Sequence, residues 1–216
     1  MKINRIVGTM ALTGLALALT GCVVTSVYPF YFEKDLTFEP ALIGDWKKAN
    51  QPDEHWKFER ATGDGYRIIT ESGGKTTVFQ GHAFKLYGRT FLDLTTTQWK
   101  EDIQPEPVPS HFLARIVQVT PTVKLSAMNY DWLKELLAKD PQALRHIVIQ
   151  IGEKADDRRI VLTADTTELQ QFLLSHLKTE GPLVYRPGEG WQHRNNEGMW
   201  EPSVELQPDP ASSPSP

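Results

Sequence analysis

Short runs of alternating apolar and polar residues, separated by glycine turns, are the feature that most restricts how this chain can fold. Trp56 and Phe58 alternate with charged or polar neighbours, and after the turn Gly63-Asp64-Gly65, Tyr66 and Ile68 alternate with Arg67 and Ile69. A period of two residues is typical of a strand that buries one face. The turns recur roughly every ten residues, which is a hairpin spacing. The sequence therefore predicts an antiparallel meander.

Further strands are expected beyond these first two runs. In the run 76–86, Val78, Phe84 and Leu86 share one face with His82. Residues 90–95, 111–119 and 123–128 continue the pattern, and 147–151 and 159–164 read as later strands.

Two helices are predicted among the later strands. Asn129 can cap a helix over 130–139, and Asp165 can cap a second one over 166–178. The second helix carries a stripe of apolar residues at helical spacing, which we expect to be buried: Leu169, Phe172, Leu173 and Leu177.

These elements indicate a mainly antiparallel β fold of about eight strands with two packed helices. Closing such a sheet removes both edges and leaves an interior for side chains or one small ligand. Gly44-Asp45-Trp46, at the start of the first strand, resembles the G-x-W that opens a lipocalin-type barrel. The resemblance implies a calycin-like or lipocalin-like barrel with Trp46 plugging one end. A strongly curved meander with helices on one face is the alternative.

The N-terminus has the layout of a secretory signal peptide. Lys2 and Arg5 precede an uncharged stretch over 6–19, which is too short to span a bilayer as a helix. The stretch ends in Leu19-Thr20-Gly21-Cys22, which resembles the lipobox of bacterial lipoproteins. The resemblance implies cleavage before Cys22, the only cysteine, and attachment of acyl chains such as palmitate to it.

In that family the residue after the cysteine directs sorting. Val23 stands there in place of aspartate, so the resemblance implies a lipid-anchored protein of the cell envelope, in the outer membrane and facing the periplasm. In a host with a single membrane, the same signal would place the domain outside the cell. The expected organisation is a signal peptide over 1–21, a lipidated cysteine and aromatic arm over 22–39, and a single β-rich domain over 40–200. A Pro/Ser-rich tail over 201–216 is expected to be disordered.

The residues 29–36 and 40–46 also resemble a group of uncharacterised bacterial envelope lipoproteins. The likeness continues in Phe91-Leu92-Asp93-Leu94 and Asp131-Trp132-Leu133 and covers most of the mature domain. No activity is attached to that group, so the resemblance implies no site residue beyond Cys22.

Composition and motifs argue against several functions. The chain has 23 basic and 27 acidic residues, without the basic face of a nucleic-acid-binding protein. Its histidines lack zinc-site spacing and its cysteine is used for lipid, so no metal or cofactor is expected. His82 and His111 can meet across the sheet as half-buried histidines. The sequence contains no nucleophile elbow, P-loop or dinucleotide motif, so we do not expect an enzyme.

Two functions remain open. The chain is either a non-enzymatic envelope lipoprotein that binds an apolar small molecule or lipid, or a protein-interaction module that docks on another envelope protein. An apolar cavity in the barrel would favour the first, and a filled interior with exposed aromatic residues the second. The tryptophans divide accordingly: Trp46, Trp56 and Trp132 are expected in the core, and Trp99, Trp191 and Trp200 at a ligand mouth or partner surface.

Overall fold

The computed structural model describes residues 24–96, 110–150, 158–177, 183–186, 190–193 and 198–210. The predicted signal peptide, Cys22 and the last residues of the tail, 211–216, lie outside the described residues.

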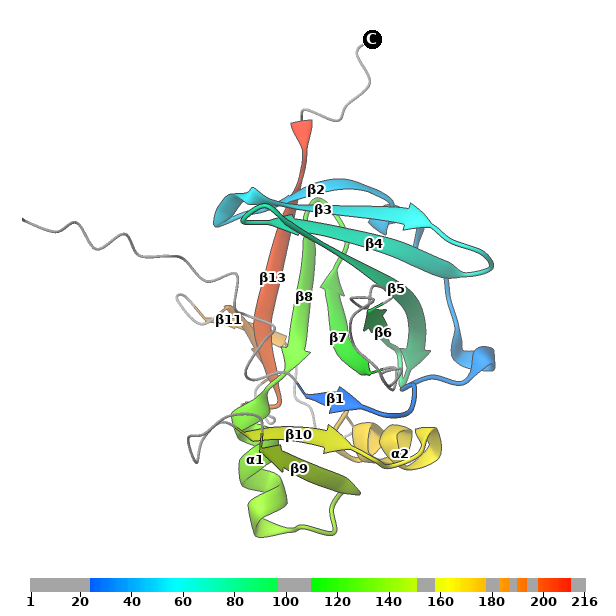
Figure 1. The fold of residues 1–216 in the computed structure, drawn as a ribbon, viewed down its shortest axis with the longest axis vertical. Coiled ribbons are helices and arrows are strands. Elements are labelled where there is room, and N and C mark those ends of the chain that lie inside the picture. The colour runs from blue at the N-terminus through cyan, green and yellow to red at the C-terminus, as the bar shows by residue number, and fades with distance from the viewer. Residues whose placement is uncertain are drawn as a thin grey trace, which may run out of the picture.

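Eight strands close into a barrel (Figure 1). They are β2 (Gly44–Lys48), β3 (Gln51–Arg60), β4 (Gly65–Ser72), β5 (Lys75–Leu86), β6 (Arg89–Thr96), β7 (His111–Gln118), β8 (Val123–Met128) and β13 (Trp200–Pro208). Each pairs antiparallel with the next along the chain from β2 to β8, and β13 closes the ring between β8 and β2. The prediction of a mainly antiparallel, lipocalin-like barrel of about eight strands with two helices is confirmed.

The closing strand β13 lies where we expected a disordered tail, so that expectation is wrong for the residues up to Pro208. Leu206 is fully buried inside the barrel, which gives the segment a hydrophobic reason to stay ordered. Pro202 is tolerated because the strand register shifts between Pro202 and Val204, at a β-bulge, and Pro208 because it is the last residue of the strand.

Side chains from all eight strands fill the barrel interior. The largest are Trp46, Trp56, Phe58, Tyr66 and Phe79, and they form one cluster with aliphatic residues that include Ile68, Leu92, Leu125 and Leu206. The interior is so crowded at Gly81 of β5 that a Cβ there would stand 2.8 Å from Ile68 Cδ1, and the Ile68 side chain would have to shift. The interior is therefore a packed core.

A second core lies outside the barrel. The sheet continues from β7 through β1 (Thr25–Ser26) and β10 (Arg158–Leu162) to β9 (His146–Gln150). Helices α1 (Tyr130–Lys139) and α2 (Thr166–Leu177) accompany this extension at the lower end of Figure 1. The outer core joins both helices to the outward-facing residues of β5, β6 and β7, such as Phe84, Phe91 and Leu113.

The two helices begin and end close to the positions that their caps predict. Asn129 Oδ1 accepts a hydrogen bond from Trp132 N at 3.0 Å, and Asp165 Oδ1 accepts one from Glu168 N at 3.1 Å. The stripe Leu169, Phe172, Leu173 and Leu177 is buried, as expected. Leu133 and Leu137 of α1 are buried too, whereas Trp132 and Leu136 are only partly covered.

The N-terminal arm packs on the domain. Val24 and Phe30 belong to the outer core, and the short helices η1 (Glu33–Asp35) and η2 (Pro40–Leu42) lead from the arm into β2. Gln170 of α2 donates hydrogen bonds to Phe30 O at 3.1 Å and to Asp35 Oδ2 at 2.9 Å. A separate hairpin, β11 (Leu183–Arg186) and β12 (Gly190–His193), completes the described elements.

Candidate functional site: a groove between the two helices

A groove of about 730 Å³ lies outside the barrel, between α1, α2 and the segment that connects α1 to β9. Helix α1 contributes Trp132 and Leu136, α2 contributes Phe172 and His176, and the connecting segment contributes Leu144. None of the residues that line the groove belongs to the barrel-interior cluster. The hollow is thus separate from the cavity position that a lipocalin-like barrel would offer.

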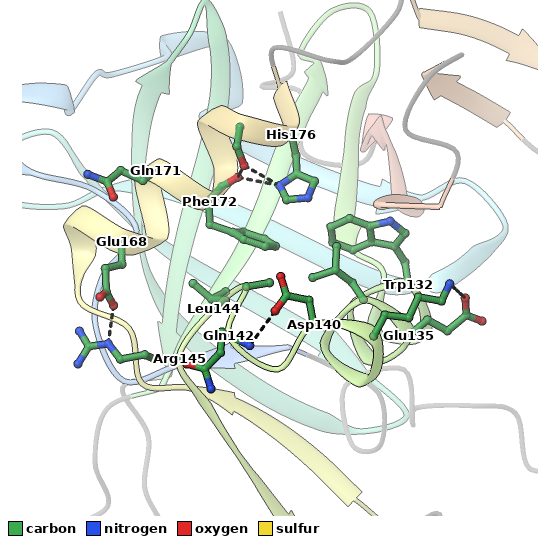
Figure 2. Close-up of a pocket in the computed structure, with 14 residues that line it drawn as sticks. Trp132, Glu135, Asp140, Gln142, Leu144, Arg145, Glu168, Gln171, Phe172 and His176 are labelled. Carbon is green, nitrogen blue, oxygen red and sulfur yellow. Dashed lines mark hydrogen bonds and ion pairs between the residues drawn. The ribbon is translucent and has the colours of Figure 1, made fainter.

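Three rings form the aromatic part of the groove. The Trp132 ring centroid lies 6.2 Å from that of Phe172 and 5.3 Å from that of His176, which it meets edge-on. Phe172 and His176 are 4.4 Å apart, one helical turn from each other on α2. Figure 2 shows the three rings lying together, with Leu144 beneath them. This arrangement offers an apolar surface whose exposure to water is unfavourable and which a ligand or partner can bury.

His176 has a defined tautomer. Its Nδ1 lies 2.8 Å from the Phe172 carbonyl oxygen, which can only accept, so Nδ1 carries the proton. Ser175 Oγ, 3.1 Å from the same nitrogen, bonds to the Phe172 carbonyl as well. The histidine is therefore held by its own helix, with its ring against Trp132.

Charged side chains surround the apolar residues. Arg145 Nε donates to Glu168 Oε2 at 2.6 Å, and its guanidinium lies 3.3 Å from Asp165 Oδ2. The bond to Glu168 raises the pKa of Arg145 further above its ordinary value, so the side chain stays cationic. Lys139 and Glu135 form a second pair at 3.9 Å. The rim thus carries both signs of charge around an apolar floor.

A second polar cluster lies on the outer face of the barrel beneath the N-terminal arm. Asp93 is almost fully buried; its carboxylate accepts a hydrogen bond from Phe30 N at 2.9 Å and contacts His111 Nδ1 at 2.7 Å. Burial lowers the pKa of the neighbouring His82, whose ring lies 5.1 Å from that of Tyr31. Burial also raises the pKa of Tyr31, and Asp93 adds to that effect.

His82 of β5 and His111 of β7 therefore approach each other across β6, which carries Asp93, as the strand pattern allowed. The cluster is covered by the arm and holds it through the Phe30 amide. Among the described residues no group of three His, Cys, Asp or Glu side chains could hold a metal ion.

The tryptophans differ in part from expectation. Trp46 is buried in the barrel interior, where its Nε1 donates to Leu42 O at 2.9 Å. Beside the barrel, the ring of Phe38 stacks on that of Tyr66 at a centroid distance of 5.1 Å, and the Arg60 guanidinium lies 4.4 Å from the Phe38 ring centroid. A role for Trp46 at a ligand end stays a prediction.

Trp132, expected in the core, lines the groove, and Trp200, expected near a mouth, is buried in the outer core. Trp99 and the side chain of Trp191 lie outside the described residues. The sequence carries no separate signal for the groove, because Trp132 and Leu136 stand beside Leu133 and Leu137 in an apolar stripe of the width that a core-facing helix normally has.

Comparisons with protein-family models, with curated proteins and with solved structures give no match. Within the described part of the chain, no helix is both long and apolar enough to cross a membrane.

Proposed function

We propose that the chain is a lipid-anchored, non-enzymatic envelope protein that binds a segment of another envelope protein in the groove between α1 and α2. The observation that carries the proposal is the contrast between the packed barrel interior and the open groove. The barrel interior is filled with aromatic and aliphatic side chains, while the groove outside it remains open with Trp132 and Phe172 in its wall.

The lining of the groove suits an amphipathic peptide segment. Apolar side chains of a partner can contact Trp132, Leu136 and Phe172, and its polar groups can reach Arg145 and Glu168 at the rim. Recognition of this kind uses a few aromatic anchors surrounded by polar groups. Anchoring through the acyl chains on Cys22 would hold the domain in the membrane plane, where a partner is also concentrated.

A second candidate is an apolar or amphipathic small molecule in the same groove. Its volume of about 730 Å³ falls within the range of small-molecule sites. The charged rim favours a protein segment over a purely apolar ligand, because the backbone and polar side chains of a segment can bond to Arg145 and Glu168.

Site-specific photo-crosslinking separates these candidates. A photoreactive amino acid replaces exposed Gln171, which lines the groove, and in a matched control it replaces exposed Lys75 at the start of β5. After irradiation of producing cells, we expect a protein-sized adduct from position 171 and none from position 75. An adduct with only the mass of a lipid would favour the second candidate. Equal labelling from both positions, or none from either, would refute a site in the groove.

A further inference from the structure

Strand β9 exposes three consecutive aliphatic side chains. Ile147, Val148 and Ile149 retain 49%, 52% and 41% of their accessible surface. β9 is the last strand in the sheet order and, among the described strands, pairs only with β10. Exposed aliphatic edges of this kind are normally protected by charge, proline or a covering element.

The apolar side chains lie on both faces of β9. Val148 pairs with Ile160, whose side chain enters the outer core, so Val148 points to the core face of the sheet. Ile147 and Ile149 point to the opposite face, beside Val161 and Arg159. A protein that packs on one face of the sheet would leave the other face exposed. The apolar part of a lipid bilayer would surround the strand and cover the side chains on both faces.

The N-terminus of the described chain enters beside this edge. Thr25 of β1 pairs with Val161, and Val161 pairs with Ile147, so Thr25 and Ile147 are two strand spacings apart, about 10 Å. β1 runs parallel to β10, so the chain before Thr25 comes from the end of the sheet where Ile149 lies. Cys22 precedes Thr25 by three residues, a reach of at most about 10 Å.

The arm is fixed to the domain from Thr25 onward. Thr25 and Ser26 are buried, Asp93 holds the Phe30 amide, and Thr166 Oγ1 donates to Pro29 O at 2.8 Å. A lipid attached at Cys22 would therefore bring this end of the sheet to the bilayer surface, instead of letting the domain swing on a tether.

We propose that Ile147, Val148 and Ile149 of β9 insert into the boundary between the lipid headgroups and the acyl chains of the bilayer to which Cys22 is anchored. This inference rests on the lipid anchor in the proposed function. Shallow insertion buries aliphatic side chains, and polar headgroups and water at this depth still satisfy the free backbone groups of the strand edge. Exposed Arg158, level with Gln150 of β9, is placed to meet lipid phosphates.

The test uses the full chain, purified from membranes and reconstituted into vesicles of phosphatidylethanolamine and phosphatidylglycerol. Because acylation occupies Cys22, the Val148→Cys variant has one reactive thiol for a polarity-sensitive fluorophore. Ile43→Cys is the matched control: Ile43 is 40% exposed and directly precedes β2, which lies at the opposite end of Figure 1 from β9. The acyl mass on Cys22 and flotation of the unlabelled protein with the vesicles are measured first.

We expect the protein to float and nitroxide-labelled lipid to quench the probe at position 148 several-fold more than the probe at position 43. Flotation with equal quenching would overturn the β9 contact and leave the anchor standing. Failure to float, without acyl mass, would refute the anchor and this inference with it. Shielding of the probe at 148 in detergent alone, increasing with protein concentration, would show that a second copy covers β9, and would also overturn the proposal.

Discussion

Replacement of Leu206 by alanine tests whether β13 closes the barrel. Leu206 is fully buried in the interior cluster, between Val123 of β8 and Lys48 of β2 in the register. The change removes three buried carbon atoms, worth about 0.8 kcal/mol each in transfer free energy. The cavity left behind adds a further cost, which brings the expected loss of unfolding free energy to about 3–4 kcal/mol, within the range seen for buried leucines.

The assay is urea unfolding of the chain from Val23 onward, followed by tryptophan fluorescence. With a urea dependence of about 2 kcal/mol per molar, the midpoint should fall by roughly 1.5–2 M. Gln207→Ala is the matched control, because Gln207 is exposed on the same strand and should change the midpoint very little. If Leu206→Ala shifts the midpoint no more than Gln207→Ala, β13 is not part of the core and the barrel is open between β8 and β2.

Three further outcomes are expected. Trp46→Ala should lower the unfolding free energy by about 3–5 kcal/mol in the same assay, because a large buried ring is lost and Leu42 O loses its donor. Cys22→Ser should abolish both acyl mass and membrane fractionation once any unprocessed precursor is accounted for; a membrane-bound serine variant would contradict lipidation. Burial lowers the pKa of His82 below its ordinary 6.5, so the unfolded chain binds a proton that the folded chain does not, and stability should decrease as pH falls through that value. His82→Gln should reduce this decrease in melts between pH 7 and pH 5, and an unchanged profile would show that His82 does not contribute to it.

The helices were the most predictable elements because their limits are fixed locally. Asn129 and Asp165 supply the acceptors that the first turns need, and the residues after them alternate at helical spacing. The strands β3 and β4 were predictable for a related reason: each turns mainly one face to the barrel interior, so its buried side chains alternate, and glycine turns mark its ends. β5 and β6 bury residues on both faces, so the glycine turns identify them better than alternation does.

β13 could not be identified in this way because its bulge reverses the alternation. Trp200 faces the outer core and Leu206 the barrel interior, although a regular strand would place two residues six apart on the same face. The extra residue between Pro202 and Val204 exchanges the inward-facing and outward-facing positions of the strand. The proline content also suggested disorder, whereas the strand gains its stability from partners, β8 and β2, that are distant in the sequence.

The groove could not be predicted from the sequence either, because it depends on how distant elements pack together. Trp132 and Leu136 belong to a stripe that, from sequence alone, is all core, and only the angle at which α1 meets α2 decides which side of the stripe is covered. Phe172 is buried as predicted and still forms part of the groove wall. A residue can thus satisfy a core prediction and line a site.

The groove and the apolar edge of β9 are continuous along the chain, which constrains what a partner can be. Arg145 lines the groove, and His146 begins β9. If β9 contacts the bilayer as proposed, the Arg145 side of the groove lies close to the headgroups, so a partner reaches it most readily along the membrane surface. A membrane-attached protein, or a segment just outside a membrane anchor, would gain the effective concentration that confinement provides. A freely diffusing partner would not, so photo-crosslinking at position 171 should be much weaker when the protein is released from the membrane by the Cys22→Ser change.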